Sequence, residues 1–186
     1  MAEINIVILC GPSASGKDAI LTELLKETKY NFKKVVTYTS RPNSRDFEKA
    51  GFSYHYLTKE DFEEKIKSGF FLEHMETHGY LYGTPKNAFS SSGNYIMQID
   101  IRGALEVKRS LPNTLIIFID VPKDQLIQRL KKRGETDKMI DVRMDTADNE
   151  FKSMVKADMI IDNPNGSFKQ TLLKAKSTLD KFLSMK

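Results

Sequence analysis

The segment that most constrains this chain is a glycine-rich stretch near its amino terminus, Gly11-Pro12-Ser13-Ala14-Ser15-Gly16-Lys17. It follows a β-branched apolar run from Ile4 to Cys10, and it precedes apolar residues at helical spacing from about Lys17 to Thr28. Strand, glycine loop and helix in this order, with the pattern G-x-x-x-x-G-K, indicate a loop whose backbone N–H groups bind phosphate oxygens. The alternative is a glycine turn followed by a surface lysine.

Lys17 and Asp18 complete this loop. We expect Lys17 to bridge the terminal phosphates, with the following helix adding the positive end of its dipole. The pattern continues with Ser or Thr, whose hydroxyl contacts Mg²⁺, whereas this chain has Asp18. A carboxylate is a hard oxygen ligand that Mg²⁺ accepts directly or through water, although it adds negative charge beside the phosphates. We therefore expect Mg²⁺ as the cofactor, held by Asp18 through water.

Strands and helices alternate along much of the remaining chain. We expect strands at Tyr95 to Ile99, Thr114 to Asp120 and Asp158 to Ile161, and helices at Ala104 to Arg109, Lys123 to Arg133 and Ser167 to Leu183. This alternation predicts an α/β fold with a parallel sheet covered by helices on both faces.

Two stretches interrupt the alternation. Residues from about 35 to 90 hold short strands and one helix near Lys59 to Lys67, and residues from about 128 to 155 are dominated by charge. We interpret both as insertions into a single domain spanning residues 1–186, with a core of about 1–34, 91–127 and 156–186.

Composition limits the classes of partner and location. The chain has 186 residues, 40% of them hydrophobic, which suits one globular domain with a sizeable core. Its net charge of +4 is small and its acids and bases are interleaved, so we expect an anionic small molecule and no nucleic acid. The apolar runs are too short for a signal sequence or a membrane span. The chain has one cysteine, Cys10, which cannot form a disulfide within the chain. We therefore expect a reducing compartment, the cytoplasm.

Four short motifs follow the glycine loop in chain order: Thr39-Ser40-Arg41, then Arg45 to Tyr54, then Phe71-Leu72-Glu73, and then Tyr82-Gly83-Thr84. Together with the loop they resemble the signatures of the guanylate kinase family over nearly the whole chain. The resemblance implies a P-loop NTPase core with a parallel sheet flanked by helices, an insert that binds the nucleoside monophosphate, and a helical lid. It further implies phosphoryl transfer from ATP to GMP, and to dGMP, by a monomer or homodimer.

The resemblance implies that Arg41, Arg45, Tyr54 and Tyr82 hold the phosphate of GMP. Guanidinium groups match phosphate oxygens with two parallel hydrogen bonds, and a phenol adds a donor without charge. The alternatives are solvated loop arginines and, for Tyr54 and Tyr56, packing across strands.

The same resemblance implies that Glu73 and Asp100 bind guanine, with Thr84 and Thr37 as hydroxyl partners. A carboxylate accepts from both N1–H and the N2 amine, a pair of donors that guanine has and adenine lacks. The alternatives are an exposed strand residue for Glu73 and a helix cap for Asp100.

Several arginines resemble those of the family's lid. The resemblance implies that Arg133 and Arg143 stabilise the transferring phosphoryl group, that Arg129 lies near the base or phosphates of ATP, and that Asn163 lies near adenine. Phosphoryl transfer needs positioning and charge neutralisation, which cations arriving on closure would supply. The alternative is a solvated charged helix.

The chain departs from the family at three places. One extra residue separates Arg41 from Arg45, Gln98 stands where the family usually has Asp, and Asp18 gives the loop a likeness to ribose 1,5-bisphosphate phosphokinases. Glu73 disfavours that sugar kinase alternative. A guanylate-kinase-like module that binds peptides without catalysis is a third reading, disfavoured by Lys17 and the lid arginines.

Overall fold

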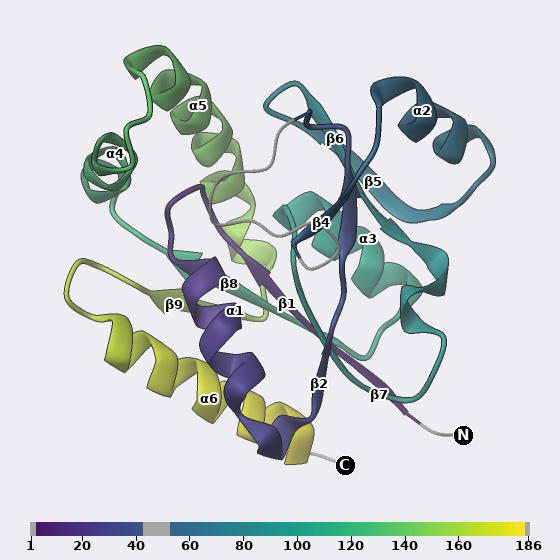
Figure 1. The fold of residues 1–186 in the computed structure, drawn as a ribbon. Coiled ribbons are helices and arrows are strands. Elements are labelled where there is room, and N and C mark those ends of the chain that lie inside the picture. The colour runs from purple at the N-terminus through teal and green to yellow at the C-terminus, as the bar shows by residue number, and fades with distance from the viewer. Residues whose placement is uncertain (1–2, 43–52, 185–186) are drawn as a thin grey trace.

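The centre of the structure, a computed structural model that describes residues 3–42 and 53–184, is a five-stranded parallel sheet. Its strand order is β2-β7-β1-β8-β9 (Figure 1). The strands are β1 (Ile4–Cys10), β2 (Phe32–Lys34), β7 (Gly93–Gln98), β8 (Thr114–Asp120) and β9 (Met159–Asp162). Because all five run the same way, their carboxyl ends meet at one edge, which is where such sheets bind ligands. The predicted α/β class is confirmed.

Helices cover both faces of this sheet. Val7 and Leu9 pack on the face covered by α1 (Lys17–Lys26) and α6 (Phe168–Ser184), which lie side by side in Figure 1. Ile6 and Ile8 pack on the opposite face, against α3 (Ile101–Ser110). Side chains that alternate between two buried faces explain why β1 reads as a continuous apolar run.

The first insertion forms a second sheet with the order β4-β3-β6-β5. Its elements are β3 (Thr37–Thr39), β4 (Tyr54–Tyr56), β5 (Phe71–Thr77), β6 (Tyr80–Pro85) and α2 (Lys59–Lys67). Phe62 of α2 stacks on Phe71 of β5 with ring centroids 4.5 Å apart. Gly83 gives this stack room, because a Cβ there would lie 2.8 Å from the Phe71 ring.

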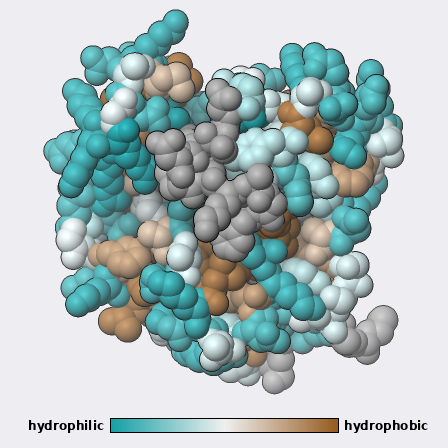
Figure 2. Space-filling model, in the orientation of Figure 1, coloured by the Kyte–Doolittle hydropathy of each residue, from teal (hydrophilic) through white to brown (hydrophobic). Residues whose placement is uncertain are grey.

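The charge-rich stretch folds into two helices, α4 (Lys123–Lys132) and α5 (Asp137–Ser153), with the Thr136 side chain capping α5. Leu126, Leu130 and Ile140 pack between them and contact Ala14 of the glycine loop. The outer surfaces of α4, α5 and α2 are mainly hydrophilic, as Figure 2 shows. Charge therefore covers an amphipathic helical pair that rests on the loop.

Element boundaries differ from the predicted ones by a few residues. The first helix ends at Lys26 and is followed by a short 3₁₀ turn, Thr28–Tyr30, and two further turns span Lys86–Phe89 and Met154–Lys156. The helix predicted from Ala104 starts at Ile101, because Asp100 caps it. Within residues 3–42 and 53–184, no helix has the length and apolar character needed to cross a bilayer.

Candidate active site

The glycine loop joins β1 to α1 with two glycines that no other residue could replace without strain. Gly11 has φ +135°, and a Cβ there would lie 2.5 Å from the carbonyl oxygen of Ile119. Gly16 has φ +93°, and a Cβ there would lie 2.6 Å from Nδ2 of Asn163. Lys17 Nζ donates to the carbonyl oxygen of Pro12 at 3.1 Å, so its ammonium group lies over the loop. This is the geometry that a phosphate-binding loop requires.

Asn163 and Arg129 anchor the glycine loop through hydrogen bonds to its carbonyl oxygens. Asn163 Nδ2 donates to the carbonyl oxygen of Ser15 at 2.7 Å, and Thr171 Oγ1 donates to Asn163 Oδ1 at 3.0 Å. Arg129 donates to the carbonyl oxygens of Ala14 at 3.1 Å and Asn163 at 2.7 Å. Burial lowers the pKa of the Arg129 guanidinium, and the positive charge of Arg133 lowers it further. Both side chains thus position the loop, and their contact with ATP stays a prediction.

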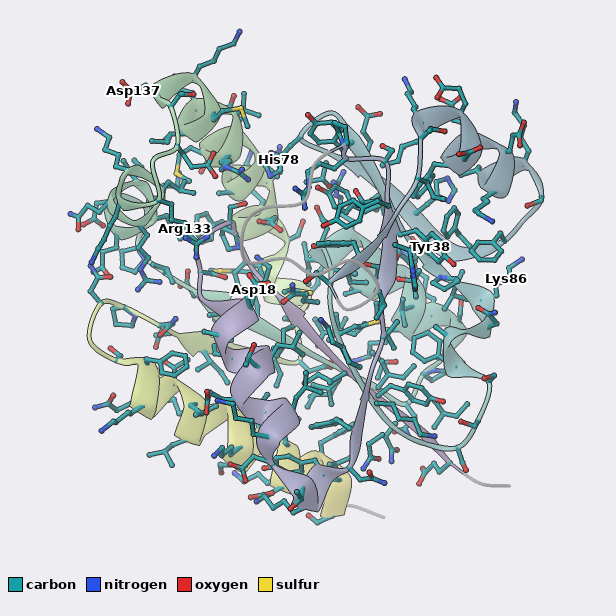
Figure 3. The ribbon with its side chains drawn as sticks, viewed as in Figure 1. Asp18, Tyr38, His78, Lys86, Arg133 and Asp137 are labelled. Atoms are coloured by element: carbon teal, nitrogen blue, oxygen red, sulfur yellow. The ribbon has the colours of Figure 1, made fainter. Side chains whose placement is uncertain are left out.

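One cavity brings most of the predicted site residues together where the core, the insert and the lid meet. It is lined by Gly11, Ser13, Ala14, Lys17, Asp18, Thr37, Tyr54, Glu73, Tyr82, Asp100, Arg133 and Arg143. Figure 3 shows Asp18 at the amino-terminal end of α1 and Arg133 beyond it, at the end of α4.

A second cavity lies on the other side of the loop. It is lined by Gly16, Arg129 and Asn163, and it shares Ala14 and Arg133 with the first cavity. The phosphate loop therefore separates two hollows, each next to part of the lid. Such an arrangement leaves room for one ligand on each side of the loop.

Glu73 is buried, with only 6% of its surface exposed, which excludes the exposed-strand alternative. Thr84 Oγ1 donates to Glu73 Oε1 at 2.5 Å. Burial raises the pKa of Glu73 to about 7, against the lowering effect of hydrogen bonds from Thr84. Gly103 of α3 makes space for the carboxyl group, because a Cβ there would lie 2.7 Å from Oε2. A buried acceptor of this kind suits a ligand with adjacent N–H donors.

Asp100 lines the cavity and also caps a helix. Its Oδ1 accepts from the backbone N–H of Arg102 at 2.8 Å, and both carboxylate oxygens accept from the Arg102 guanidinium at 3.0 Å. The cap that the sequence left as an alternative is therefore present. Hydrogen bonding to Asp100 raises the pKa of Arg102. The contact of Asp100 with guanine stays a prediction.

Two of the residues predicted to hold the phosphate of GMP, Tyr54 and Tyr82, lie on strands of the second sheet. The rings of Tyr54 and Tyr82 meet edge to face, with centroids 5.9 Å apart, and both residues line the first cavity. The Arg41 guanidinium carbon lies 5.8 Å from the ring centroids of both Tyr54 and Tyr56. Tyr56 also meets the ring of Tyr54, its neighbour on the same strand, with centroids 6.1 Å apart. Arg45 lies outside the residues that the structure describes.

The lid supplies a buried arginine to the first cavity. Arg143 is 6% exposed, donates to Ser13 Oγ at 3.1 Å, and pairs with Glu135 Oε1 at 2.9 Å. Glu150, near the carboxyl end of α5, also lines the cavity. Burial raises the pKa of Glu150 to about 7, although the neighbouring Lys17 opposes that shift. The lid arginine is therefore not a solvated charge.

Sequence reasoning missed several residues that shape the cavity. Gly103 had a signal, because glycine inside a helix costs about 1 kcal/mol and needs a reason. Arg102, which holds Asp100, and Glu135, which pairs with Arg143, had none. His78 also had no signal in the sequence. It lies in the β5–β6 turn with φ +54°, and its Nδ1 is 3.2 Å from Oγ1 of Thr146 on lid helix α5.

Asp18 fits a metal ion that arrives with a nucleotide. Among the described residues, no group of three or more His, Cys, Asp or Glu side chains could hold a metal on its own. Asp18 lines the first cavity, where its Oδ1 accepts from Gln98 Nε2 at 2.5 Å. Mg²⁺ commonly takes one or two carboxylates and completes its shell with water and substrate phosphates. The donor set suits that arrangement.

Comparisons with known proteins agree with the geometry. A family model described as guanylate kinase matches residues 3–182. Guanylate kinase of Thermotoga maritima is 37% identical over 168 residues, covering 87% of this chain and 80% of that protein. Guanylate kinase of Wolinella succinogenes is 40% identical over 165 residues, covering 85% of this chain and 76% of that protein. The crystal structure of guanylate kinase from Anaplasma phagocytophilum superposes with a TM-score of 0.76 at 25% identity. The superposition covers 100% of this chain and 88% of that chain. The chain belongs to the guanylate kinase family.

Proposed function

We propose that this protein transfers the terminal phosphoryl group of ATP to GMP, and to dGMP, giving ADP and the nucleoside diphosphate. The observation that carries the proposal is that the phosphate loop and the buried carboxyl group of Glu73 open into one cavity. The loop supplies an anion site, and Glu73 supplies an acceptor for the N1–H and N2 amine of guanine. Membership of the guanylate kinase family supports the same reaction.

ATP would bind across the loop. Its phosphates would contact the loop N–H groups and Lys17, and the amino-terminal end of α1 would add positive potential. Its adenine would occupy the second cavity, next to Arg129 and Asn163, which already hold the loop. This placement directs the terminal phosphate toward the first cavity.

GMP would bind in the first cavity with its base against Glu73, Thr84 and Asp100. Tyr54 and Tyr82, which line this cavity, would direct its phosphate toward the loop together with Arg41 and Arg45, and Thr37 would be a further hydroxyl partner of the base. A phosphate monoester has a second pKa near 6, so at neutral pH an oxygen of GMP is already deprotonated. That oxygen attacks the terminal phosphorus in line, the bond to the bridging oxygen breaks, and ADP leaves. No side chain needs to act as a nucleophile or base.

The lid would complete the site. Arg143 and Arg133 carry positive charge to the cavity from α5 and the end of α4, where they would neutralise the transferring group. Mg²⁺, when bound, would shield the phosphate charge, and Asp18 would hold it through water. The His78–Thr146 contact joins the insert to the lid, and both residues line the first cavity, so GMP bound there would favour a closed lid that excludes water. GMP should therefore raise ATP turnover well above the basal rate.

A coupled assay of ADP release tests the reaction, with GMP, dGMP, AMP, UMP and ribose 1,5-bisphosphate as acceptors. We expect turnover with GMP and dGMP only. Turnover with the sugar bisphosphate alone would favour the sugar kinase alternative, and binding without any turnover would favour a binding module. The cytoplasmic location and the monomeric or homodimeric state remain predictions.

A further inference from the structure

Two departures from the expected sequence pattern meet in space. Position 18 has a carboxylate where the loop pattern has a hydroxyl, and position 98 has an amide where the family usually has a carboxylate. In the structure Gln98 Nε2 donates to Asp18 Oδ1 at 2.5 Å. The carboxylate has thus changed places between two side chains that touch.

The fold explains why these distant residues meet. Strand β7 pairs in parallel with β1, with Gln98 opposite Leu9, so β7 ends beside the point where the loop begins. Asp18 lies in the first turn of α1, at the other end of the loop. Both residues line the first cavity. A cation bound to the phosphates on the loop would therefore face both side chains.

Each side chain retains an oxygen that can accept a further bond. Among the described residues, the Asp18 carboxylate accepts one hydrogen bond, from Gln98 Nε2 to its Oδ1. Gln98 Oε1 is buried and has no hydrogen-bond partner within the same described residues. A buried acceptor without a partner is unfavourable, so a ligand that supplies a donor there would be favoured.

We propose that Asp18 and Gln98 form one cation-anchoring pair with exchanged roles. Asp18 provides the negative charge for the Mg²⁺ that accompanies the nucleotide. Gln98 is a positioning residue that orients Asp18 through Nε2 and accepts, through Oε1, from water bound to the metal. The inference rests on the proposed function, because the cation arrives with ATP or ADP.

The exchange keeps the charge of the site constant. A hydroxyl at position 18 with a carboxylate at position 98 has one negative charge, as Asp18 with Gln98 has. Burial lowers the pKa of Lys34 at the end of β2, and the Asp18 carboxylate partly opposes that shift. The two positions should consequently behave as a unit, and a change at one should be repaired by the matching change at the other.

Calorimetric titration with ADP tests the pair without any turnover. The readout is the ratio of ADP affinity with Mg²⁺ to ADP affinity in EDTA, measured for wild type, Asp18→Ser, Gln98→Leu and the double variant Asp18→Ser/Gln98→Asp. Asp18→Ser should lower the ratio by about tenfold or more, and Gln98→Leu by about tenfold, the usual loss for an outer-shell partner. The double variant should recover most of the wild-type ratio. Glu23→Gln, which removes a carboxylate from the same helix away from the loop, should leave it unchanged.

An unchanged ratio in Asp18→Ser would overturn the proposal. A lowered ratio that the second substitution fails to restore would overturn the exchanged role of Gln98, provided that the melting temperatures match. A wild-type protein that binds Mg²⁺-ADP but does not phosphorylate GMP would instead contradict the proposed function, because the calorimetric ratio does not depend on GMP.

Discussion

The phosphate end and the base end of the cavity are built in different ways. At the loop, the groups that would bind the ligand are backbone N–H groups of consecutive residues, held by Asn163 and Arg129. At the base end, one carboxyl group from β5 meets a hydroxyl from β6, in a space left by Gly103 of α3. Main-chain donors do not titrate, whereas Glu73 has a pKa of about 7. The difference teaches that phosphate binding at the loop should be insensitive to the protonation of the protein, whereas recognition of the base should depend on the ionisation of Glu73.

The largest effect should come from the loop. Replacing Lys17 by Met removes the ammonium group that would stabilise the transferring phosphoryl group, and we expect kcat to fall about 10²- to 10³-fold. Coupled ADP release measures the loss, and calorimetry with GMP should show unchanged affinity. Lys26→Met, at the exposed end of the same helix, is the control. A loss of GMP affinity in Lys17→Met would remove the distinction between the two ends.

Glu73→Gln should damage the base end alone. The amide can no longer accept from both donors of guanine, so kcat/KM for GMP should fall about ten- to hundredfold, with the KM for ATP unchanged. The control is Glu76→Gln, on the same strand and exposed. Equal kinetics for Glu73→Gln and wild type would show that Glu73 does not bind the base.

Gly103→Ala should act on the base end through Glu73. The new methyl group would meet Oε2, since a Cβ there lies 2.7 Å away, and the carboxyl group must shift. We expect GMP affinity to fall about tenfold by calorimetry, the effect of one misplaced methyl group in a pocket. Ser110→Ala, at the end of the same helix, should have no such effect. Unchanged GMP binding would mean that the carboxyl group moves freely.

The pH dependence should separate the two ends. Burial raises the pKa of Glu73 to about 7, and guanine needs the ionised form, so GMP affinity should rise about tenfold from about pH 6 to about pH 8. GMP titrates near pH 6 itself. The measurement is therefore the difference between wild type and Glu73→Gln, which should show the smaller rise. Affinity for ADP should not follow this difference, and if it does, the titrating group is not at the base end.

The free protein should respond to pH in the opposite sense. Glu73 and Glu150 both have a folded-state pKa of about 7 against an ordinary value of 4.5. Their neutral forms favour folding, so this stabilisation is full below about pH 4.5 and is lost as the pH rises through about 7. Urea unfolding of wild type and of Glu73→Gln along this range should show a smaller pH-linked loss in the variant. A parallel decline in both proteins would assign the loss to Glu150 alone.

The smallest effect should come from Ala14, a non-glycine residue at φ +67° in the loop. A left-handed conformation costs an alanine about 1–2 kcal/mol, and glycine loses about 0.4–1 kcal/mol more unfolded-state entropy. Ala14→Gly should consequently raise the free energy of unfolding by about 0.5 kcal/mol, read from urea denaturation. A decrease would show that the contacts of Ala14 with the lid outweigh its strain.

The sequence was sufficient for the regions whose structure is local. Ile4–Cys10, Thr114–Asp120 and Lys59–Lys67 have the predicted ends, because apolar periodicity and turn residues mark them. The loop was predictable for the same reason, since its seven residues are consecutive and its flanking elements follow directly. Family resemblance then supplied candidates such as Glu73 and Arg143, which the fold brings to one cavity.

The remaining features depend on which elements become neighbours. Arg102 holds Asp100 only because α3 begins where β7 ends, and Asn163 reaches the Ser15 carbonyl only because β9 ends near the loop. The pairing of Gln98 with Asp18 likewise requires β7 to lie beside β1. No spacing in one sequence reports such neighbours, because sheet order is set by tertiary packing.

The pairing of Arg143 with Glu135 has a consequence for nucleotide binding. Both residues belong to the lid, so the guanidinium is already desolvated and neutralised by a companion that travels with it. Removing a charge from water is the expensive part of burying an ion, and here that step precedes the arrival of nucleotide. We expect a bound phosphate to replace Glu135 as the anion beside Arg143, so that closing α4 and α5 over a nucleotide would not require the removal of water from this arginine.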